Sequence, residues 1–399
     1  MPGLTNIRLR KTARDIEAKR LVRRTSRLCH YEYLLCLFSH HLLKPSPRVG
    51  TVPTKMIRGE AMERKVIATL ALIPAGLTIG FNGAMTAQSG KTPDEPAIVS
   101  LQPVRALTDD SSWFDTWPGF SPDGKEIVFS RTPVTGERSA RLWRMPADGG
   151  PPHPLTPIAF DRHCTRPDWS LDGKTIAFRA GRGTPLKPMN PFTNDAPGAI
   201  WLFTVATGEM RPLTDERKYD DYYPHWSPDG RWIFISRNDI YRSKQWDIWR
   251  ISLHGAEERL TSHPSYDVYG VPSPDGKLFS FNSDRDGNRN VWIIDLGKGE
   301  KEATQFTFSG GRGAMWSPDG QWIAFHPPPS VMNGSIYIKR VNGGPRIQIT
   351  ECTGENVQGH PHWSPDGKYI LFDEVDPNPQ RASRGHLKVV DVSKIVGRQ

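Results

Sequence analysis

The stretch HWSPDGRWIFISRNDIYRSKQWDIWRISLHGAEERLT, residues 225–261, decides the fold. It opens with a Ser-Pro-Asp-Gly turn, in which proline fixes φ at about −65° and glycine accepts a positive φ. Two alternating apolar runs follow, WIFIS and DIWRI, and a glycine-containing turn leads to a third run that ends in Leu-Thr. Because alternation with period two is typical of strands with one buried face, the stretch predicts consecutive antiparallel strands.

The same anatomy occurs six times along the chain. The turn aspartates are Asp123, Asp172, Asp229, Asp275, Asp319 and Asp366, spaced by 49, 57, 46, 44 and 47 residues. With a short strand before each turn, a unit has four strands, which is the pattern of a β-propeller blade. The sixth copy lacks its last strand, and SLQPVRALT (100–108) carries the same Leu-Thr ending. We therefore predict an all-β, six-bladed β-propeller of four-stranded antiparallel blades over residues 100–395, with its ring closed by this N-terminal strand.

The basic charge of the chain is confined to one end. Residues 1–61 contain 13 Lys/Arg and 4 Asp/Glu, so the whole formal excess of +9 lies there. The remaining residues carry 39 charges of each sign. The high pI therefore gives no reason to expect a nucleic-acid partner.

Residues 62–87 have the layout of a secretory signal peptide: a basic start after Met62, an apolar run over 66–81, and small residues at Ala84 and Ala87. We expect residues 1–61 to be either an over-called extension or a disordered leader, and residues 88–99 to be a linker. The mature protein is then periplasmic or secreted, monomeric, and without a membrane span. Cys164 and Cys352 show no paired spacing and are predicted to be free thiols.

The repeated W-S-P-D-G-K/R turn, its apolar strand and the loop SDRDGN (283–288) resemble the propeller of TolB and its relatives over roughly residues 100–395. TolB also has an α/β domain before its propeller, for which this sequence has no room between residue 88 and the first strand, so the resemblance covers the propeller alone. It implies a non-catalytic binding or scaffolding module for an envelope protein or polymer. A detached propeller like the gating domain of prolyl peptidases is a weaker interpretation.

Candidate ligand-binding residues come from the innermost strand of each blade. With period two, residues one, three and five places before the Trp-equivalent position share one side of the strand and face the mouth of the propeller. The candidates are Trp117, Arg166, Asp221, Tyr223, His225, Asp267, Tyr269, Gln358, His360 and His362. Such a lining suits a polar ligand, either a peptide segment or a sugar. The acid five places back is present in three blades, which favours a shared structural hydrogen bond.

The segment NVQGHPHW (356–363) leaves a metal site open as an alternative. Gln358, His360 and His362 have a chelating spacing, and oligogalacturonate lyases, which are propellers of related repeat type, use a similar Gln and His-x-His for a divalent metal. That resemblance implies a metal-dependent polysaccharide lyase. The glutamine is one residue closer than in the lyases, and no further histidine is evident in the fifth blade, so a lining role is favoured over a metal. Without a recognisable catalytic motif, we predict no catalytic residue and no cofactor.

Overall fold

The computed structural model describes residues 97–135, 139–157, 159–182, 197–239, 245–327, 334–353, 356–376 and 384–397. The chain divides into two compact units, residues 1–85 and 86–399, and every described residue belongs to the second. The expected leader, signal peptide and most of the loop 180–198 lie outside the described residues. The described ranges contain no helix with the length and apolar character of a membrane span.

Three sheets of the second unit each contain four consecutive antiparallel strands. The first has β7 (His163–Trp169), β8 (Thr175–Gly181), β9 (Gly198–Thr204) and β10 (Met210–Pro212). The second has β11 (Tyr219–Trp226), β12 (Trp232–Asp239), β13 (Trp246–Ser252) and β14 (Glu257–Arg259). The third has β15 (Val268–Pro272), β16 (Leu278–Ser283), β17 (Asn290–Asp295) and β18 (Thr304–Gln305), with the short 3-10 helix η1 (Glu300–Glu302) before β18.

Two larger sheets contain the other strands. One has β19 (Arg312–Trp316), β20 (Trp322–His326), β21 (Tyr337–Arg340), β22 (Arg346–Gln348) and, parallel to β22, β1 (Ala97–Val99). The other has β23 (Val357–Trp363), β24 (Tyr369–Val375), β25 (Gly385–Asp391), β3 (Trp113–Phe120), β4 (Glu126–Pro133), β5 (Arg141–Pro146) and β6 (His153–Pro154). In this sheet β2 (Val104–Ala106) pairs antiparallel with β25, and one parallel bridge joins Gly385 of β25 to Phe114 of β3. The helix α2 (Ser393–Val396) follows β25.

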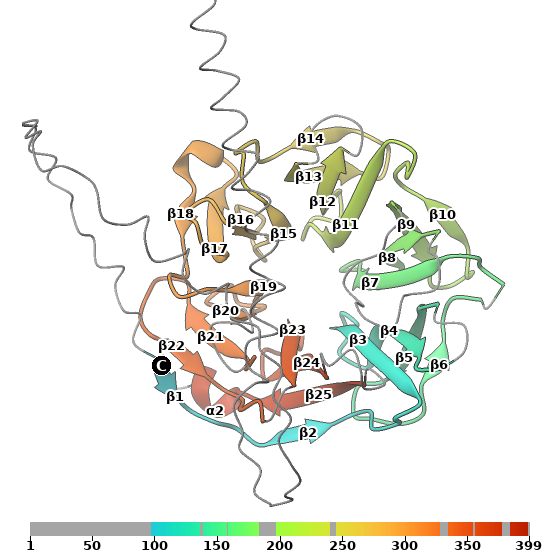
Figure 1. Cartoon of the computed structure of the whole chain (residues 1–399), viewed down its shortest axis with the longest axis horizontal. Helices are drawn as coiled ribbons and strands as arrows, with labels where there is room; N and C mark the ends of the chain where they lie inside the picture. The colour runs from blue at the N-terminus through green and yellow to red at the C-terminus, as the bar shows by residue number, and fades with distance from the viewer. Residues whose placement is uncertain are drawn as a thin grey trace, which may run out of the picture. The chain divides into compact units, whose positions relative to one another are not determined.

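The sheets of the second unit follow one another around a common centre, and the strands nearest to it are β3, β7, β11, β15, β19 and β23 (Figure 1). This arrangement confirms an all-β propeller with four-stranded antiparallel blades. One difference is that β1 lies inside the segment expected to be a linker. It adds a fifth strand to one sheet and leaves the side chain of Val99 64% exposed.

The Ser-Pro-Asp-Gly turns are closed by their own side chains. In the third copy Ser227 Oγ donates to Asp229 Oδ1 at 2.6 Å and accepts the Trp232 backbone N–H at 2.9 Å. Gly230 has a φ of +68°, as the turn chemistry predicts. The same serine–aspartate contact is present in all six copies. These turns are therefore structural parts of the repeat.

The threonine of each Leu-Thr ending also has one structural role. Its side-chain oxygen accepts a hydrogen bond from a backbone N–H of the third strand of the blade. In one example Thr261 Oγ1 accepts the N–H of Ile248 at 2.9 Å. The other five threonines that do this are Thr108, Thr156, Thr214, Thr307 and Thr350. The donor for Thr108 is Leu387 of β25, which lies 279 residues further along the chain.

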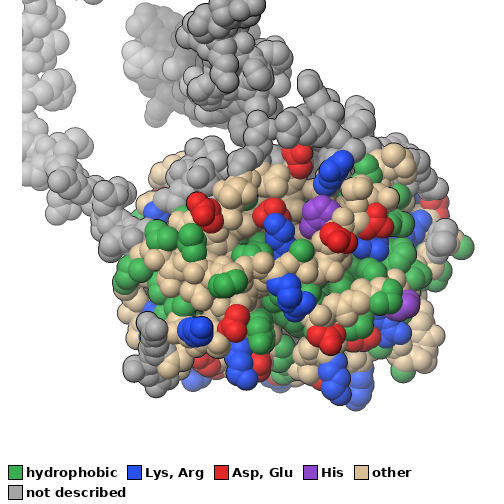
Figure 2. Space-filling view, turned by 90° about the horizontal axis from the view of Figure 1, so that it is seen from below, with side chains coloured by type: hydrophobic (Ala, Val, Ile, Leu, Met, Phe, Trp, Pro, Cys, Tyr) green, Lys and Arg blue, Asp and Glu red, His purple; other side chains and the backbone are tan. Residues whose placement is uncertain are grey.

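The core lies between neighbouring sheets. The second strand of each sequence repeat contributes a completely buried phenylalanine, and these are Phe129, Phe178, Phe234, Phe279, Phe325 and Phe372. Of the cysteines in the described ranges, Cys164 and Cys352 are both free and buried, as predicted. On the side of the molecule drawn in Figure 2, acidic and basic side chains are interspersed, in agreement with the balanced charge of residues 62–399.

Candidate functional site

A β-bulge interrupts each innermost strand at the same repeat position. In β11 the pairing with β12 shifts between Tyr222 and His225, and the other five innermost strands shift at the equivalent place. The bulged residue has a left-handed backbone: φ is +57° at Trp117, +57° at Arg166, +53° at Tyr223, +64° at Tyr269, +60° at Gly313 and +49° at His360. A bulge breaks the period of two. The expectation that the residue five places back shares one side with those one and three places back is therefore wrong.

The previous blade stabilises several of these bulges. The backbone N–H of Tyr269 donates to Ser236 Oγ at 2.8 Å, and that of Trp117 donates to Asp373 Oδ2 at 2.9 Å. Arg166 and Gly313 make equivalent bonds to Ser130 and Asn282. In each case the acceptor is a side chain on a second strand, and the donor is the bulge of an innermost strand outside the hairpin of that acceptor. The bulge conformation is thus fixed by contacts between blades.

The acids five places back lie away from the centre, inside the blades. Asp221 and Asp267 are at most 1% exposed and pair with Arg237 and Arg285, both at 2.8 Å. Asp115 pairs with Arg131 in the same way at 2.7 Å. Burial raises the pKa of Asp267 to about 6, although the Ser283 hydroxyl and the Arg285 charge oppose the shift. Each of the three carboxylates therefore forms a structural ion pair inside its own blade.

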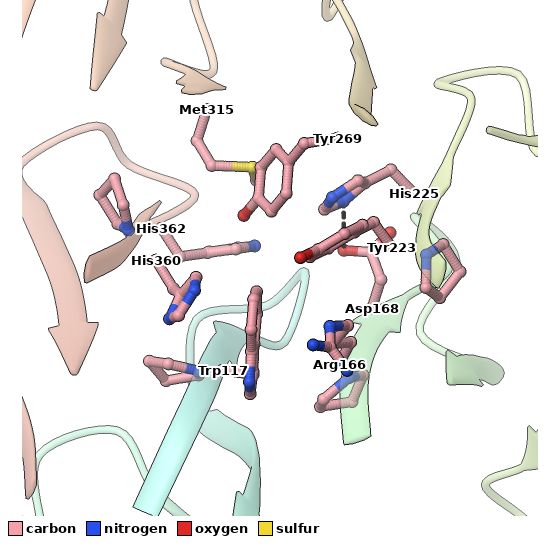
Figure 3. Close-up of a pocket in the computed structure, with 13 residues that line it drawn as sticks. Trp117, Arg166, Asp168, Tyr223, His225, Tyr269, Met315, His360 and His362 are labelled. Carbon is pink, nitrogen blue, oxygen red and sulfur yellow. Dashed lines mark ion pairs between the residues drawn. The ribbon is translucent and has the colours of Figure 1, made fainter. Parts of the chain in front are cut away.

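The residues three and one places back meet instead in a central pocket (Figure 3). Seven of the ten predicted ligand-binding residues line it: Trp117, Arg166, Tyr223, His225, Tyr269, His360 and His362. The other three, Asp221, Asp267 and Gln358, do not. Asp168 and Met315 complete the polar and apolar lining together with four prolines. The free space inside is only about 20 Å³, enough for roughly one water molecule.

A stack of three side chains forms one wall of the pocket. The ring centroids of Trp117 and His360 are 3.3 Å apart, and the guanidinium carbon of Arg166 lies 4.4 Å from the Trp117 ring. His360 Nδ1 lies 2.7 Å from Asp373 Oδ2, the same oxygen that accepts the Trp117 N–H. Asp373 is 1% exposed, so these two contacts replace water around its charge.

A second acid–imidazole pair lies across the pocket. His225 Nδ1 is 3.7 Å from Asp168 Oδ1, and the other oxygen of Asp168 accepts the Trp226 backbone N–H at 2.8 Å. His362 Nδ1 lies 3.0 Å from its neighbour's carbonyl, Trp363 O. Burial lowers the pKa of His362, which favours its neutral form.

The side chains proposed for a metal do not form a prepared site. Gln358 is 1% exposed, bonds Thr350 Oγ1 through its oxygen, and donates to Glu374 Oε2 at 2.8 Å. His360 is bonded to Asp373. The bulge at His360 also breaks the alternation of β23, so His360 and Gln358 do not point to the same side of the strand. Among the described residues no group of three His, Cys, Asp or Glu side chains is placed to coordinate a metal ion.

His326 and Asp373 lie near the pocket and were not among the residues predicted from the sequence. His326 of β20, in the blade where no further histidine was evident, has its ring centroid 5.9 Å from that of His360. It occupies space beside Gly313, and burial lowers its pKa to about 3. His326 and Asp373 share one repeat position, the second-strand partner of the residue before the bulge. Alignment of the second strands, in addition to the first, would have found both.

Fold and pocket together define a β-propeller of four-stranded antiparallel blades with a lined central pocket. The model of the TolB beta propeller domain matches residues 189–392, more than half of the chain, and the chain belongs to that family.

Similar proteins agree with this assignment. The uncharacterized protein Atu1656 of Agrobacterium fabrum is 30% identical over 221 residues, which cover 52% of this chain and 68% of that protein. The uncharacterized peptidase YuxL of Bacillus subtilis is 27% identical over 218 residues, which cover 53% of this chain but only 29% of YuxL. The structure of a putative TolB from Agrobacterium tumefaciens aligns with a TM-score of 0.52 at 22% identity, covering 72% of this chain and 93% of that one. The last similarity shows the fold alone.

Proposed function

We propose that the chain is an exported, non-catalytic TolB-like propeller that binds an envelope protein or polymer at its central pocket. Membership of the TolB propeller family supports the binding role. The signal-peptide layout over 62–87 supports a periplasmic or secreted location. The balanced charge of the remaining chain gives no reason to invoke nucleic acid.

We infer that the ring has six blades and that the N-terminal strand closes it. The eight-stranded sheet then counts as two blades, since its two halves are joined by one bridge. Pairing of β2 with β25 supports the closure, as does the bond of Thr108 to Leu387 N. The contact of Trp117 N with Asp373 also supports it, since other neighbouring blades are joined by the same kind of bond.

The observation that carries the binding proposal is the set of strained residues around the pocket. Five non-glycine residues adopt a left-handed backbone there, at Trp117, Arg166, Tyr223, Tyr269 and His360. Each such residue costs on the order of 1 kcal/mol relative to glycine, and Gly313 is at the equivalent position in the fifth blade. Strained positions that present aromatic and ionisable side chains to one cavity favour a ligand site.

The ionisable groups at the pocket already make contacts within the protein, and this favours binding over catalysis. The carboxylates of Asp373 and Asp168 accept backbone N–H groups of a neighbouring blade and lie beside His360 and His225. These acids already have structural partners. A general base needs a lone pair directed at a substrate proton.

Site-specific photocrosslinking tests the proposal. A photoreactive residue replaces either Tyr223, half-buried in the pocket, or Lys174, exposed beside a Ser-Leu-Asp-Gly turn. We expect the Tyr223 position to crosslink one envelope component in cells and the Lys174 position not to. Equal crosslinking from both positions would contradict a pocket-directed partner. Cleavage of oligogalacturonate by the purified chain, seen as rising ultraviolet absorbance, would favour the lyase alternative instead.

A further inference from the structure

We propose that Arg166 is the receptor for a carboxylate at the tip of a peptide ligand, either a chain terminus or an Asp or Glu side chain. This inference rests on the proposed function, because it names the chemical group by which the central pocket recognises its partner.

Arg166 is a buried cation without a protein anion. It is 5% exposed, and a guanidinium stays charged at any physiological pH. Its Nη1 donates to Thr165 Oγ1 at 3.0 Å, while its Nε is buried with no hydrogen-bond partner. No carboxylate of the described residues lies within ion-pairing distance of it. An unpaired buried charge raises the free energy of the folded state, so the site favours an incoming anion.

Other buried arginines on the neighbouring strands show the difference. Arg131, Arg179 and Arg237 pair with the carboxylates of Asp115, Asp220 and Asp221 at 2.7, 3.1 and 2.8 Å. All three lie on second strands, whereas Arg166 lies at a bulge of an innermost strand. The left-handed backbone places Arg166 in the lining of the pocket (Figure 3).

Aromatic rings hold the guanidinium in place. Its carbon lies 4.4 Å from the ring centroid of Trp117, 4.7 Å from that of Tyr222 and 4.9 Å from that of Tyr223. Cation–π contacts offset part of the desolvation and orient the planar group, but they do not satisfy its N–H donors. The guanidinium is therefore held in one orientation, and the N–H groups of its two terminal nitrogens that are not bonded to Thr165 can meet a carboxylate.

The two acids nearest the pocket are occupied by other contacts. Asp168 faces His225 and accepts the Trp226 N–H, and Asp373 lies beside His360 and accepts the Trp117 N–H. Neither makes an ion pair with Arg166. Negative charge on these acids repels an entering anion more strongly the more charge that anion carries, so a single carboxylate is favoured over a polyanion.

The contacts on the Trp117 ring favour a peptide carboxylate over a sugar acid. Sugar rings bind proteins by stacking on exposed aromatic faces, and here the Trp117 ring has His360 at 3.3 Å and Arg166 at 4.4 Å. A carboxylate at the end of a peptide needs no free ring face.

Ligand-observed NMR titration of the full chain tests this inference with three probes: acetyl-Gly-Gly with a free carboxylate, the same peptide as its C-terminal amide, and galacturonic acid. We expect the free acid to bind at least tenfold more tightly than the amide and than the sugar acid. Arg166→Gln should abolish the preference for the acid while the fold persists, because no carboxylate is left unpaired. Arg166→Lys keeps the positive charge but loses the planar guanidinium, and it should bind the peptide with the free carboxylate several-fold more weakly.

Arg231→Gln is the matched control, since Arg231 is exposed and pairs with Asp229 at a turn. It should bind the acid as the unmodified chain does. Equal binding of acid and amide, unchanged acid binding by Arg166→Gln, or tighter binding of galacturonic acid would overturn the inference. If Arg166→Gln fails to fold, the test rests on Arg166→Lys, and unchanged binding of the acid by that variant would overturn the inference. Crosslinking from Tyr223 without any preference for the acid would leave the proposed function standing and remove this inference alone.

Discussion

At Gly230 the backbone φ is +68°, and a Cβ added there would meet no heavy atom within 4 Å. Any loss of stability in Gly230→Ala therefore comes from backbone strain and not from a clash. We expect a loss of about 1 kcal/mol in the free energy of unfolding, measured by urea denaturation. Gly230→Asn should lose less, because asparagine tolerates the left-handed region. An alanine variant as stable as the parent would contradict the assigned strain.

The element that decides whether the ring is closed is the short N-terminal segment of β2 and Thr108. Thr108→Val removes the acceptor for the Leu387 N–H and leaves that donor buried. An unsatisfied buried donor costs on the order of 1–3 kcal/mol, so the free energy of unfolding should fall by that amount. Thr261→Val removes the equivalent bond to Ile248 N inside one blade and should cost the same.

Comparison of these two variants by urea denaturation separates closure from a local effect. If Thr108→Val leaves stability unchanged while Thr261→Val lowers it, the N-terminal strand does not close the ring.

At the scale of the whole molecule, a buried histidine links stability to pH. Burial, assisted by nearby arginine charges, lowers the pKa of His163 to about 3, and its Nδ1 accepts the Ala140 N–H at 2.8 Å. The unfolded chain binds a proton at His163 near pH 6.5 and the folded chain does not. This contribution to stability is present above pH 6.5 and is lost as the pH falls toward 3.

His163→Asn keeps a hydrogen-bond acceptor and removes the titration. Between pH 7 and pH 5 the variant should lose about 2 kcal/mol less stability than the parent chain, measured by urea denaturation at both pH values. His254→Asn changes an exposed histidine and should leave the pH dependence unaltered. Parallel pH profiles for the parent and His163→Asn would show that His163 titrates equally in both states.

The sequence by itself determined the repeat and the strands within it, because the signals are local. A turn such as Ser227 to Gly230 closes through bonds between residues at most five places apart, so its residues specify it wherever it occurs. Alternation of apolar residues predicted the strands, and seven of the ten candidate ligand residues do line the pocket.

Only the tertiary structure decided which side chains face the centre. The bulge at Tyr269 or Trp117 depends on an acceptor from another blade, up to 256 residues away in the case of Asp373, and no period within one strand encodes it. For that reason the acids Asp221 and Asp267 were expected at the mouth and are instead paired inside the blades. The bulge turns the neighbouring positions toward the axis, and the same inter-blade packing leaves Arg166 buried without a protein anion.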